Sequence, residues 1–308
     1  MVHVFAKPAL TYQQQIAHLA ANGMVIPDHA AAEFWLRHGS YYRLSAYWLY
    51  FERPKGSPGP RFQSGTTFER VTRLYDFDRL LRRLVMRGTE HVEVALRGSW
   101  AYQTAHLSDG HRYLDPALYS NRREHRLSTT KLARAVRDSH ETYIAHYRTK
   151  YAAPVLPPCW MVAEMMSLGQ LSRWYSNLAS RSLRNDIARP LGLPETVLVP
   201  LVQHLTSIRN TCAHHGRLWN RGFLIAPKLA MKPADLHQSL DHGATGAGVR
   251  IYNGLTMIAH VVRTVAPDST WAVDLKTHLQ THPEGDLAAM GFPVDWDTRS
   301  LWLTPPTV

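Results

Sequence analysis

The side chains with the clearest chemical potential lie close together near residue 210. Arg209 and Asn210 are followed, after three residues, by His214. A histidine titrates near neutral pH and can move a proton, a guanidinium can hold a phosphate, and an amide can orient either group. The three residue types therefore suit cleavage of an RNA phosphodiester. The spacing alone is weak evidence, because an arginine and a histidine five positions apart also occur by chance on solvated helix faces.

A helix is expected to carry these residues. One apolar face recurs at helical spacing, formed by Leu201, Val202, Leu205, Ile208 and Cys212. Pro200 fits the first turn of this helix, where its missing N–H costs nothing. At about 100° per residue, Asn210 and His214 stack one turn apart on the opposite, polar side. Arg209 lies beside this polar stripe.

The residues after His214 allow two arrangements. If the helix continues past Gly216, Arg217 and Arg221 join the polar stripe. Gly216 fits equally well as the residue just after the helix, with Arg217 to Arg221 in a following turn. His215 falls toward the apolar face and is expected to be a structural histidine.

The rest of the chain predicts an all-α fold, without alternating strand patterns of useful length or internal repeats. Glu164 is expected to be buried unless it pairs with another side chain. Loops or flexible segments are expected at 52–66, 152–158 and 231–248. Helices are expected over 11–22, Pro27 to about Arg37, 67–107, about 132–151, 159–178, 181–188, 250–265 and 270–281, with a C-terminal tail that packs back on the core.

Glu93 and Arg97 lie four residues apart within 67–107, which is expected to form one long helix or two joined helices. Such a pair can simply join on the surface, which contributes a few tenths of a kcal/mol. Alternatively, the two side chains support the centre around His214. Spacing alone favours the surface pair, because it does not show whether this segment packs against the helix that carries His214.

A strong positive charge points to a polyanionic partner. The chain has 35 Lys and Arg against 24 Asp and Glu, a net charge of +11. Nucleic acid is the commonest polyanion, although a merely basic protein also fits. The aromatic segment 39–51 is expected to form a core helix, or else a base-stacking surface with Arg43 on phosphate. A basic run over 108–131 is either a solvated face or an RNA backbone contact, and the candidate contacts are Arg43, Arg122, Arg123, Arg126, Lys131 and Arg221.

Several classes of protein are disfavoured by the sequence. No apolar run is long enough to cross a bilayer, and the first residues lack the apolar core of a signal peptide. Two cysteines, Cys159 and Cys212, are too few for a disulfide framework, so a reducing cytoplasm is the expected compartment. The eighteen histidines are scattered and show no zinc or carboxylate–histidine spacing. Metal catalysis is therefore a distant second hypothesis, and no metal or cofactor is expected.

Five strings of residues stand out along the chain: Tyr41–Trp48, Glu93–Arg97, Trp160–Glu164 with Ser167 and Gly169–Leu171, Arg209–Arg221, and Met290–Pro293 with Trp296. Together they resemble Abi-like abortive-infection proteins of the AbiD/AbiF type. The order and spacing of the strings hold over nearly the whole chain. Ala46 stands where a glycine is usual in the family.

The resemblance implies a fold and a mechanism. The family belongs to the HEPN superfamily of helical nucleic-acid enzymes, in which two Arg-x4-6-His motifs pair across a dimer without a metal. It implies that Arg209 and His214 are catalytic, with Asn210 as their orienting neighbour, and that Glu93, Arg97, His215 and Arg217 support them. Members are implicated in phage defence, and several resemble toxins that a partner restrains, in some cases a small noncoding RNA.

The leading hypothesis is a metal-independent endoribonuclease that acts in phage defence as a homodimer. The alternative is a HEPN-like protein that holds a structured noncoding RNA without cutting it. A protein-interaction scaffold would explain the amphipathic helices but not the charge. We expect one HEPN-like helical domain over 1–308, with an N-terminal part at 1–66, a core at 67–221 and additional C-terminal helices at 222–308.

Overall fold

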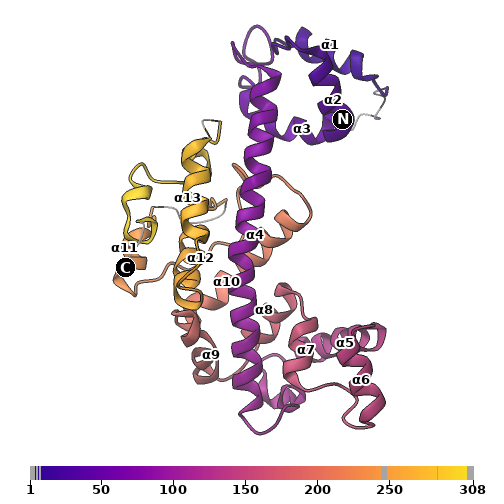
Figure 1. Cartoon of the computed structure of the whole chain (residues 1–308), viewed down its shortest axis with the longest axis vertical. Coiled ribbons are helices and arrows are strands. Elements are labelled where there is room, and N and C mark those ends of the chain that lie inside the picture. The colour runs from indigo at the N-terminus through magenta and orange to yellow at the C-terminus, as the bar shows by residue number, and fades with distance from the viewer. Residues whose placement is uncertain (1–3, 5, 7, 244–247, 283, 304–308) are drawn as a thin grey trace. The chain divides into compact units, whose positions relative to one another are not determined.

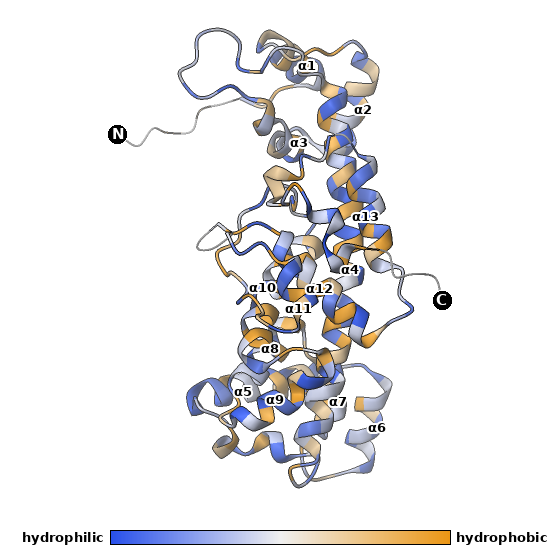
Figure 2. Cartoon of the chain, turned by 90° about the vertical axis from the view of Figure 1, so that its left-hand side faces the viewer, coloured by the Kyte–Doolittle hydropathy of each residue, from blue (hydrophilic) through white to orange (hydrophobic). Residues whose placement is uncertain are grey.

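The computed structural model describes residues 4, 6, 8–243, 248–282 and 284–303 (Figure 1). The described residues form α-helices, short 3₁₀ turns and isolated β-bridges, without a β-strand of greater length. The predicted all-α class is therefore confirmed. Hydrophilic and hydrophobic residues alternate along most helices, as amphipathic packing requires (Figure 2). No helix in the described part of the chain has both the length and the apolar character needed to cross a membrane.

The chain divides into two compact units. Unit 1 comprises Met1–Leu81 and Gln280–Asp286, and unit 2 comprises Arg82–Leu279 and Leu287–Val308. The long helix α4 (Phe68–Ala105) contributes its first residues to unit 1 and the rest to unit 2. Its continuity decides between one helix and two joined helices over 67–107. The proposed single domain over 1–308 remains a prediction.

Unit 1 begins with three short helices, α1 (Tyr12–Ala21), α2 (His29–Gly39) and α3 (Tyr41–Trp48). Thr11 and Gln14 form a capping box at the start of α1, and Asp28 caps α2 through the N–H of Ala31. These side chains satisfy N–H groups that the first turn leaves without partners. The predicted starts of both helices are confirmed.

The aromatic segment is only partly a core. Tyr47 and Trp48 are buried, and the Tyr47 hydroxyl donates to Asp78 at 2.7 Å. Tyr42 and Tyr50 are exposed, at 88% and 38%, so the segment forms a core helix only in part. The helical period explains the difference, because Tyr42 projects from the opposite side of α3 to the buried Leu44 and Trp48.

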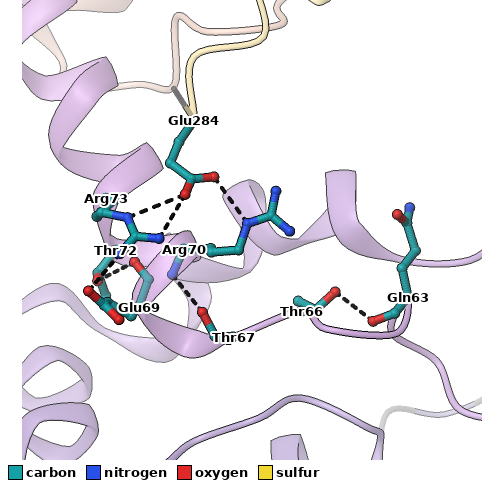
Figure 3. Close-up of polar contacts among 8 residues, drawn as sticks. All are labelled: Gln63, Thr66, Thr67, Glu69, Arg70, Thr72, Arg73 and Glu284. Carbon is teal, nitrogen blue, oxygen red and sulfur yellow. Dashed lines mark hydrogen bonds and ion pairs between the residues drawn. The ribbon is translucent and has the colours of Figure 1, made fainter. Parts of the chain in front are cut away.

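A charged cluster holds segment Gln280–Asp286 to the start of α4 within unit 1 (Figure 3). Glu284 accepts from Arg70 Nε at 3.2 Å and from Arg73 Nη2 at 2.8 Å. Arg73 also pairs with Glu69 one turn earlier, at 2.6 Å. We call Glu284, Arg70 and Arg73 the unit 1 cluster.

Unit 2 contains helices that position the candidate site. α10 (Glu195–Ala213) packs against α8 (Leu168–Ser176), α9 (Arg181–Ala188) and α12 (Tyr252–Val265). α5 (Arg122–Asp138) packs against α7 (Cys159–Met165) and α8 (Figure 1). The remaining helices are α6 (Thr142–Lys150), α11 (Ala234–Ser239) and α13 (Trp271–Thr281).

The core of unit 2 surrounds α12, where every residue from Tyr252 to Val262 is buried. Trp296 and Trp302 of the C-terminal tail are also buried, which confirms that the tail packs on the core. The predicted helices over 181–188, 250–265 and 270–281 are present. Segment 231–248 contains α11, while its residues 244–247 lie outside the described part of the chain.

Two predicted helices are broken. The helix expected over 159–178 divides into α7 and α8, and Ser167 caps α8 in a capping box with Gln170. The helix expected to run on to residue 151 divides into α5 and α6. Apolar residues continue across the first break, from Met165 and Met166 to Leu168, so hydrophobic pattern alone could not show it. The second break falls within six polar residues, Arg137–Thr142.

Candidate functional site

Helices α4, α7 and α10 of unit 2 bring four charged side chains together. Glu93 Oε1 accepts from Arg97 Nη2 at 2.8 Å, and Glu93 Oε2 lies 3.8 Å from Arg209 Nε. Arg97 Nη1 lies 3.2 Å from Glu164 Oε2. Glu93, Arg97, Glu164 and Arg209 are called the unit 2 cluster below. Glu93 thus does both things considered from the sequence: it pairs with Arg97 and it contacts the arginine of the candidate centre.

Burial differs along the unit 2 cluster. The side chains of Glu93 and Arg97 are 14% and 15% exposed, Arg209 is 30% exposed and Glu164 is 59% exposed. Glu164 was expected to be buried unless it paired, and it is paired but exposed. The break after α7 explains this, because Glu164 lies in the last turn before the chain changes direction.

Arg97 also caps the C-terminal end of α7. Its Nη2 donates to the Met166 carbonyl at 2.9 Å and its Nη1 to the Glu164 carbonyl at 3.4 Å. The last carbonyls of a helix lack intrahelical partners and carry partial negative charge, which a guanidinium stabilises. Arg97 therefore fixes the position of α7 as well as that of Glu93.

Close packing positions α10 against α8. A Cβ atom on Gly169 of α8 would lie 3.1 Å from Thr206 Cγ2 of α10, tighter than nearly all real contacts. A glycine at this position allows the two helices to approach closely. α10 begins at Glu195, so Pro200 lies inside the helix rather than in the first turn as expected.

The C-terminal end of α10 presents His214 and Asn210 to solvent. The backbone N–H of His214 donates to the Asn210 carbonyl at 3.0 Å, and both side chains are exposed. Arg209 Nη1 donates to Asn210 Oδ1 at 3.3 Å. The three residues proposed from the sequence therefore lie at one helix end. Asn210 holds the guanidinium, as an orienting amide would.

The helix ends before Gly216. Ala213 is its last residue, and His215 takes a left-handed conformation with φ 55°. The N–H of Gly216 donates to Thr211 O at 2.8 Å and that of His215 to Cys212 O at 3.0 Å. These are the two bonds of a Schellman motif, with His215 in the position that glycine usually takes. His215 is exposed, so its expected place toward the apolar face was wrong because the helix stops first.

Two buried side chains hold the turn that follows. Leu218 and Trp219 are fully buried, and Asn220 takes φ 49° while its carbonyl accepts from Arg250 Nη1 at 2.9 Å. Arg217 is half-buried and Arg221 is exposed. Both arginines thus lie in a turn outside α10, and the stripe that a longer helix would have given does not form.

His204, in the middle of α10, shows the opposite environment. Its Nδ1 lies 2.6 Å from the Ile225 carbonyl, and burial lowers its pKa to about 4. A Cβ on Gly254 of α12 would lie 2.8 Å from His204 Nε2, so the two helices enclose the ring. His204 is therefore a neutral core histidine, unlike the exposed His214.

The candidate RNA contacts fall in both units. Arg122, Arg123, Arg126 and Lys131 are exposed on α5 of unit 2, whereas His125 of the same basic run is buried. His125 stacks on Tyr119 with ring centroids 4.3 Å apart. Arg43 is half-buried on α3 of unit 1. All four of these exposed cations lie on α5.

A second group of polar residues lies beside Glu164 and was not predicted from the sequence. A pocket of about 550 Å³ is lined by Glu164 together with Ser139, His140, Glu141 and Tyr143. His140 follows Arg134 in a loose arginine–histidine pattern, but the residues around it do not resemble those around Arg209 and His214. Within the described residues, no group of three or more His, Cys, Asp or Glu side chains is arranged to hold a metal ion.

A family model described as Abi-like protein matches residues 34–220, which is more than half of the chain. The chain therefore belongs to the Abi-like family, and this membership supports a role in abortive infection. The matched residues include all four members of the unit 2 cluster as well as Asn210 and His214. No match was found among curated proteins or among solved structures.

Proposed function

We propose that this protein is a metal-independent endoribonuclease that acts in phage defence by abortive infection. One observation carries the proposal: Arg209, held by Glu93 and Asn210, lies five residues before an exposed histidine at the end of the same helix. A guanidinium and an imidazole at solvent provide a phosphate clamp and a proton carrier. The net charge of +11 suits a polyanionic substrate.

The proposed reaction is attack by the RNA 2′-hydroxyl on the neighbouring phosphate. His214 takes the hydroxyl proton, the 2′-oxygen forms a bond to phosphorus, and the bond from phosphorus to the 5′-oxygen breaks. The 5′-oxygen leaves with a proton, either from the imidazolium or from water. Arg209 stabilises the negative charge that builds on the phosphate oxygens. The products are a 2′,3′-cyclic phosphate and a 5′-hydroxyl end.

The unit 2 cluster gives Arg209 a defined position. Glu93 contacts Arg209 and is itself fixed by Arg97, which is anchored to the carbonyls of α7. Such supporting contacts matter because catalysis requires groups held close to the productive geometry. Glu93 and Arg97 are therefore positioning residues in this proposal.

The experiment is incubation of the purified protein with a labelled RNA in EDTA. We expect cleavage with cyclic phosphate ends, and its loss in both His214→Ala and Arg209→Ala. His146→Ala provides a matched control, because His146 is an exposed histidine on α6 outside the cluster. Cleavage that requires a divalent ion, or that survives both site substitutions, would overturn the proposal.

A second function is favoured by the exposed cations of α5: retention of a structured RNA without cleavage. The resemblance also suggests a small noncoding RNA as regulator and a second copy of the chain as partner. A discrete intact RNA that copurifies with wild-type protein, and no cleavage in EDTA or with Mg²⁺, would favour this function. Light scattering with and without RNA measures whether the chain forms a dimer.

A further inference from the structure

A polar pocket lies beside the unit 2 cluster and shares Glu164 with it. Its volume is about 550 Å³, and its lining comes from the end of α5, the start of α6 and the end of α7. Glu164 Oε2 accepts from Arg97, which links the pocket through Glu93 to Arg209. Three charged contacts thus connect this pocket to the proposed phosphate clamp.

The side chains that line the pocket select the kind of group it can take. Glu141 and Glu164 supply two carboxylates, which repel a phosphate and accept hydrogen bonds from N–H groups. Burial, together with these two carboxylates, raises the pKa of Tyr143, while Arg97 lowers it. The phenol therefore stays protonated and offers a donor as well as a ring face. His140 adds a second ring to the lining.

Among RNA groups, a nucleobase fits this chemistry. Proteins read unpaired RNA bases by stacking them on aromatic rings and by bonding to their Watson–Crick edges. Guanine presents two adjacent donors on that edge, N1–H and the 2-amino group, which match the two oxygens of one carboxylate. Its O6 accepts, which matches a protonated tyrosine. Uracil lacks an amino group, and cytosine and adenine place an acceptor beside theirs.

We propose that the pocket lined by Tyr143 and Glu164 binds an unpaired guanine base next to the bond that is cut. This proposal rests on the proposed nuclease function and names its substrate preference. Glu164 accepts from the guanine edge while it keeps its contact with Arg97, so recognition of the base and the position of Arg209 are connected. Tyr143 stacks on the base or donates to O6.

Binding of nucleosides to the full-length protein tests the pocket without relying on cleavage. Guanosine, inosine and uridine are titrated by NMR, because inosine differs from guanosine only in lacking the 2-amino group. A good two-bond contact to a base is worth enough that we expect guanosine to bind about tenfold more tightly than inosine, or about 1.4 kcal/mol. Glu164→Gln should reduce this preference to about twofold or less, because an amide nitrogen replaces one acceptor.

Two further variants keep the test independent of folding defects. Tyr143→Ala should weaken guanosine and inosine alike, since it removes the stacking ring. Glu124→Gln changes a carboxylate on α5 outside the pocket and should leave the preference unchanged. Equal binding of the three nucleosides, or a preference that survives Glu164→Gln, would overturn the proposal.

Cleavage of short RNAs separates the pocket from the nuclease. Replacing the single guanosine of an oligonucleotide with inosine should slow cleavage by about tenfold in wild type and by about twofold in Glu164→Gln. Cleavage that ignores this replacement contradicts the guanine pocket while the nuclease function stands. Selective binding of guanosine with no cleavage of any RNA supports the pocket and contradicts the nuclease.

Discussion

Both units of this protein contain a glutamate held between two arginines, yet the two clusters differ in burial and in surroundings. In unit 1, Glu284 is 10% exposed, whereas its partners Arg70 and Arg73 are 42% and 47% exposed. In unit 2, Glu93 and Arg97 are both about 15% exposed, and Arg97 also reaches two backbone carbonyls. The unit 1 cluster therefore ties one segment to a helix, whereas the unit 2 cluster fixes three helices around Arg209.

The comparison shows that a carboxylate between two guanidiniums does not by itself indicate a chemical site. The unit 2 cluster differs because it includes Arg209 of α10, and His214 is exposed to solvent at the end of the same helix. In the described part of unit 1, the only cation–ring contact of the cluster is Arg70 over Phe51, with 4.9 Å to the ring centroid. A structural tether and a candidate catalytic centre can thus share one ion-pair pattern.

The largest expected difference between the clusters is in RNA cleavage. Arg209→Ala should reduce the rate by about a hundredfold to a thousandfold, the range found when a group that stabilises transition-state charge is removed. Arg73→Ala removes an arginine that is also paired with a glutamate, and cleavage should stay within about twofold of wild type, as for most surface changes. Single-turnover rates in EDTA measure both effects.

Thermal unfolding of the two variants serves as the control for this comparison. Both arginines are partly exposed, so neither substitution should prevent folding. Equal losses of cleavage in Arg209→Ala and Arg73→Ala would show that the unit 2 cluster has no special role.

The second expected effect concerns His204, the neutral histidine buried on α10. Because burial lowers the pKa of His204 to about 4, the folded protein excludes a proton that the unfolded chain takes up below about pH 6.5. The free energy of unfolding should therefore fall as the pH is lowered through this window, by up to about 3 kcal/mol. Above pH 6.5 this contribution is fully present.

Urea unfolding at intervals between pH 7 and pH 4 measures this dependence. Carboxylates also titrate in the lower part of the window, so His204→Gln provides the comparison. Its stability should fall less steeply than that of wild type between pH 6.5 and 4.5. Parallel curves would mean that His204 is protonated in the folded state.

The sequence predicts most of the fold because its helices carry local signals. Thr11 and Asp28 mark helix starts through their own backbone contacts, and Gly and Pro mark the loop over 52–66. The two breaks also carry local signals that the predicted long helices did not use: Ser167 and Gln170 have the spacing of a capping box, and Arg137–Thr142 is a run of six polar residues. The first break is stabilised by Arg97, which is distant in sequence and could not be assigned from the local pattern.

The candidate site divides in the same way. Arg209, Asn210 and His214 follow from residue types and spacing within one helix, and the end of α10 keeps them together. The contact of Glu93 with Arg209 depends on the packing of α4 against α10, which spacing cannot show. His215 was predicted to face the apolar side of a helix. Its own left-handed conformation ends the helix instead, one residue earlier than if Gly216 had taken that conformation. The roles of these residues in cleavage remain predictions.

The third expected effect concerns how much the central carboxylate of each cluster, Glu93 or Glu284, contributes to the free energy of unfolding. Glu93→Gln should lower the free energy of unfolding by about 2 kcal/mol, because it leaves a largely buried guanidinium with one carboxylate fewer. The cost stays below that of a fully buried pair since Arg97 retains Glu164 and two carbonyls. Urea unfolding measures the change, and a loss of less than about 0.5 kcal/mol would contradict the assigned support of Arg97.

The smallest effect is expected for Glu284→Gln, which makes the same chemical change in the unit 1 cluster. Arg70 and Arg73 are more than one-third exposed, so water can replace the lost carboxylate, and Arg73 keeps Glu69. The loss should be about 1 kcal/mol or less and should shrink further in high salt, as for exposed ion pairs. RNA cleavage should be unchanged. If Glu284→Gln instead destabilises the protein as strongly as Glu93→Gln, exposure of the arginines does not separate the two clusters, and burial is the wrong basis for the distinction.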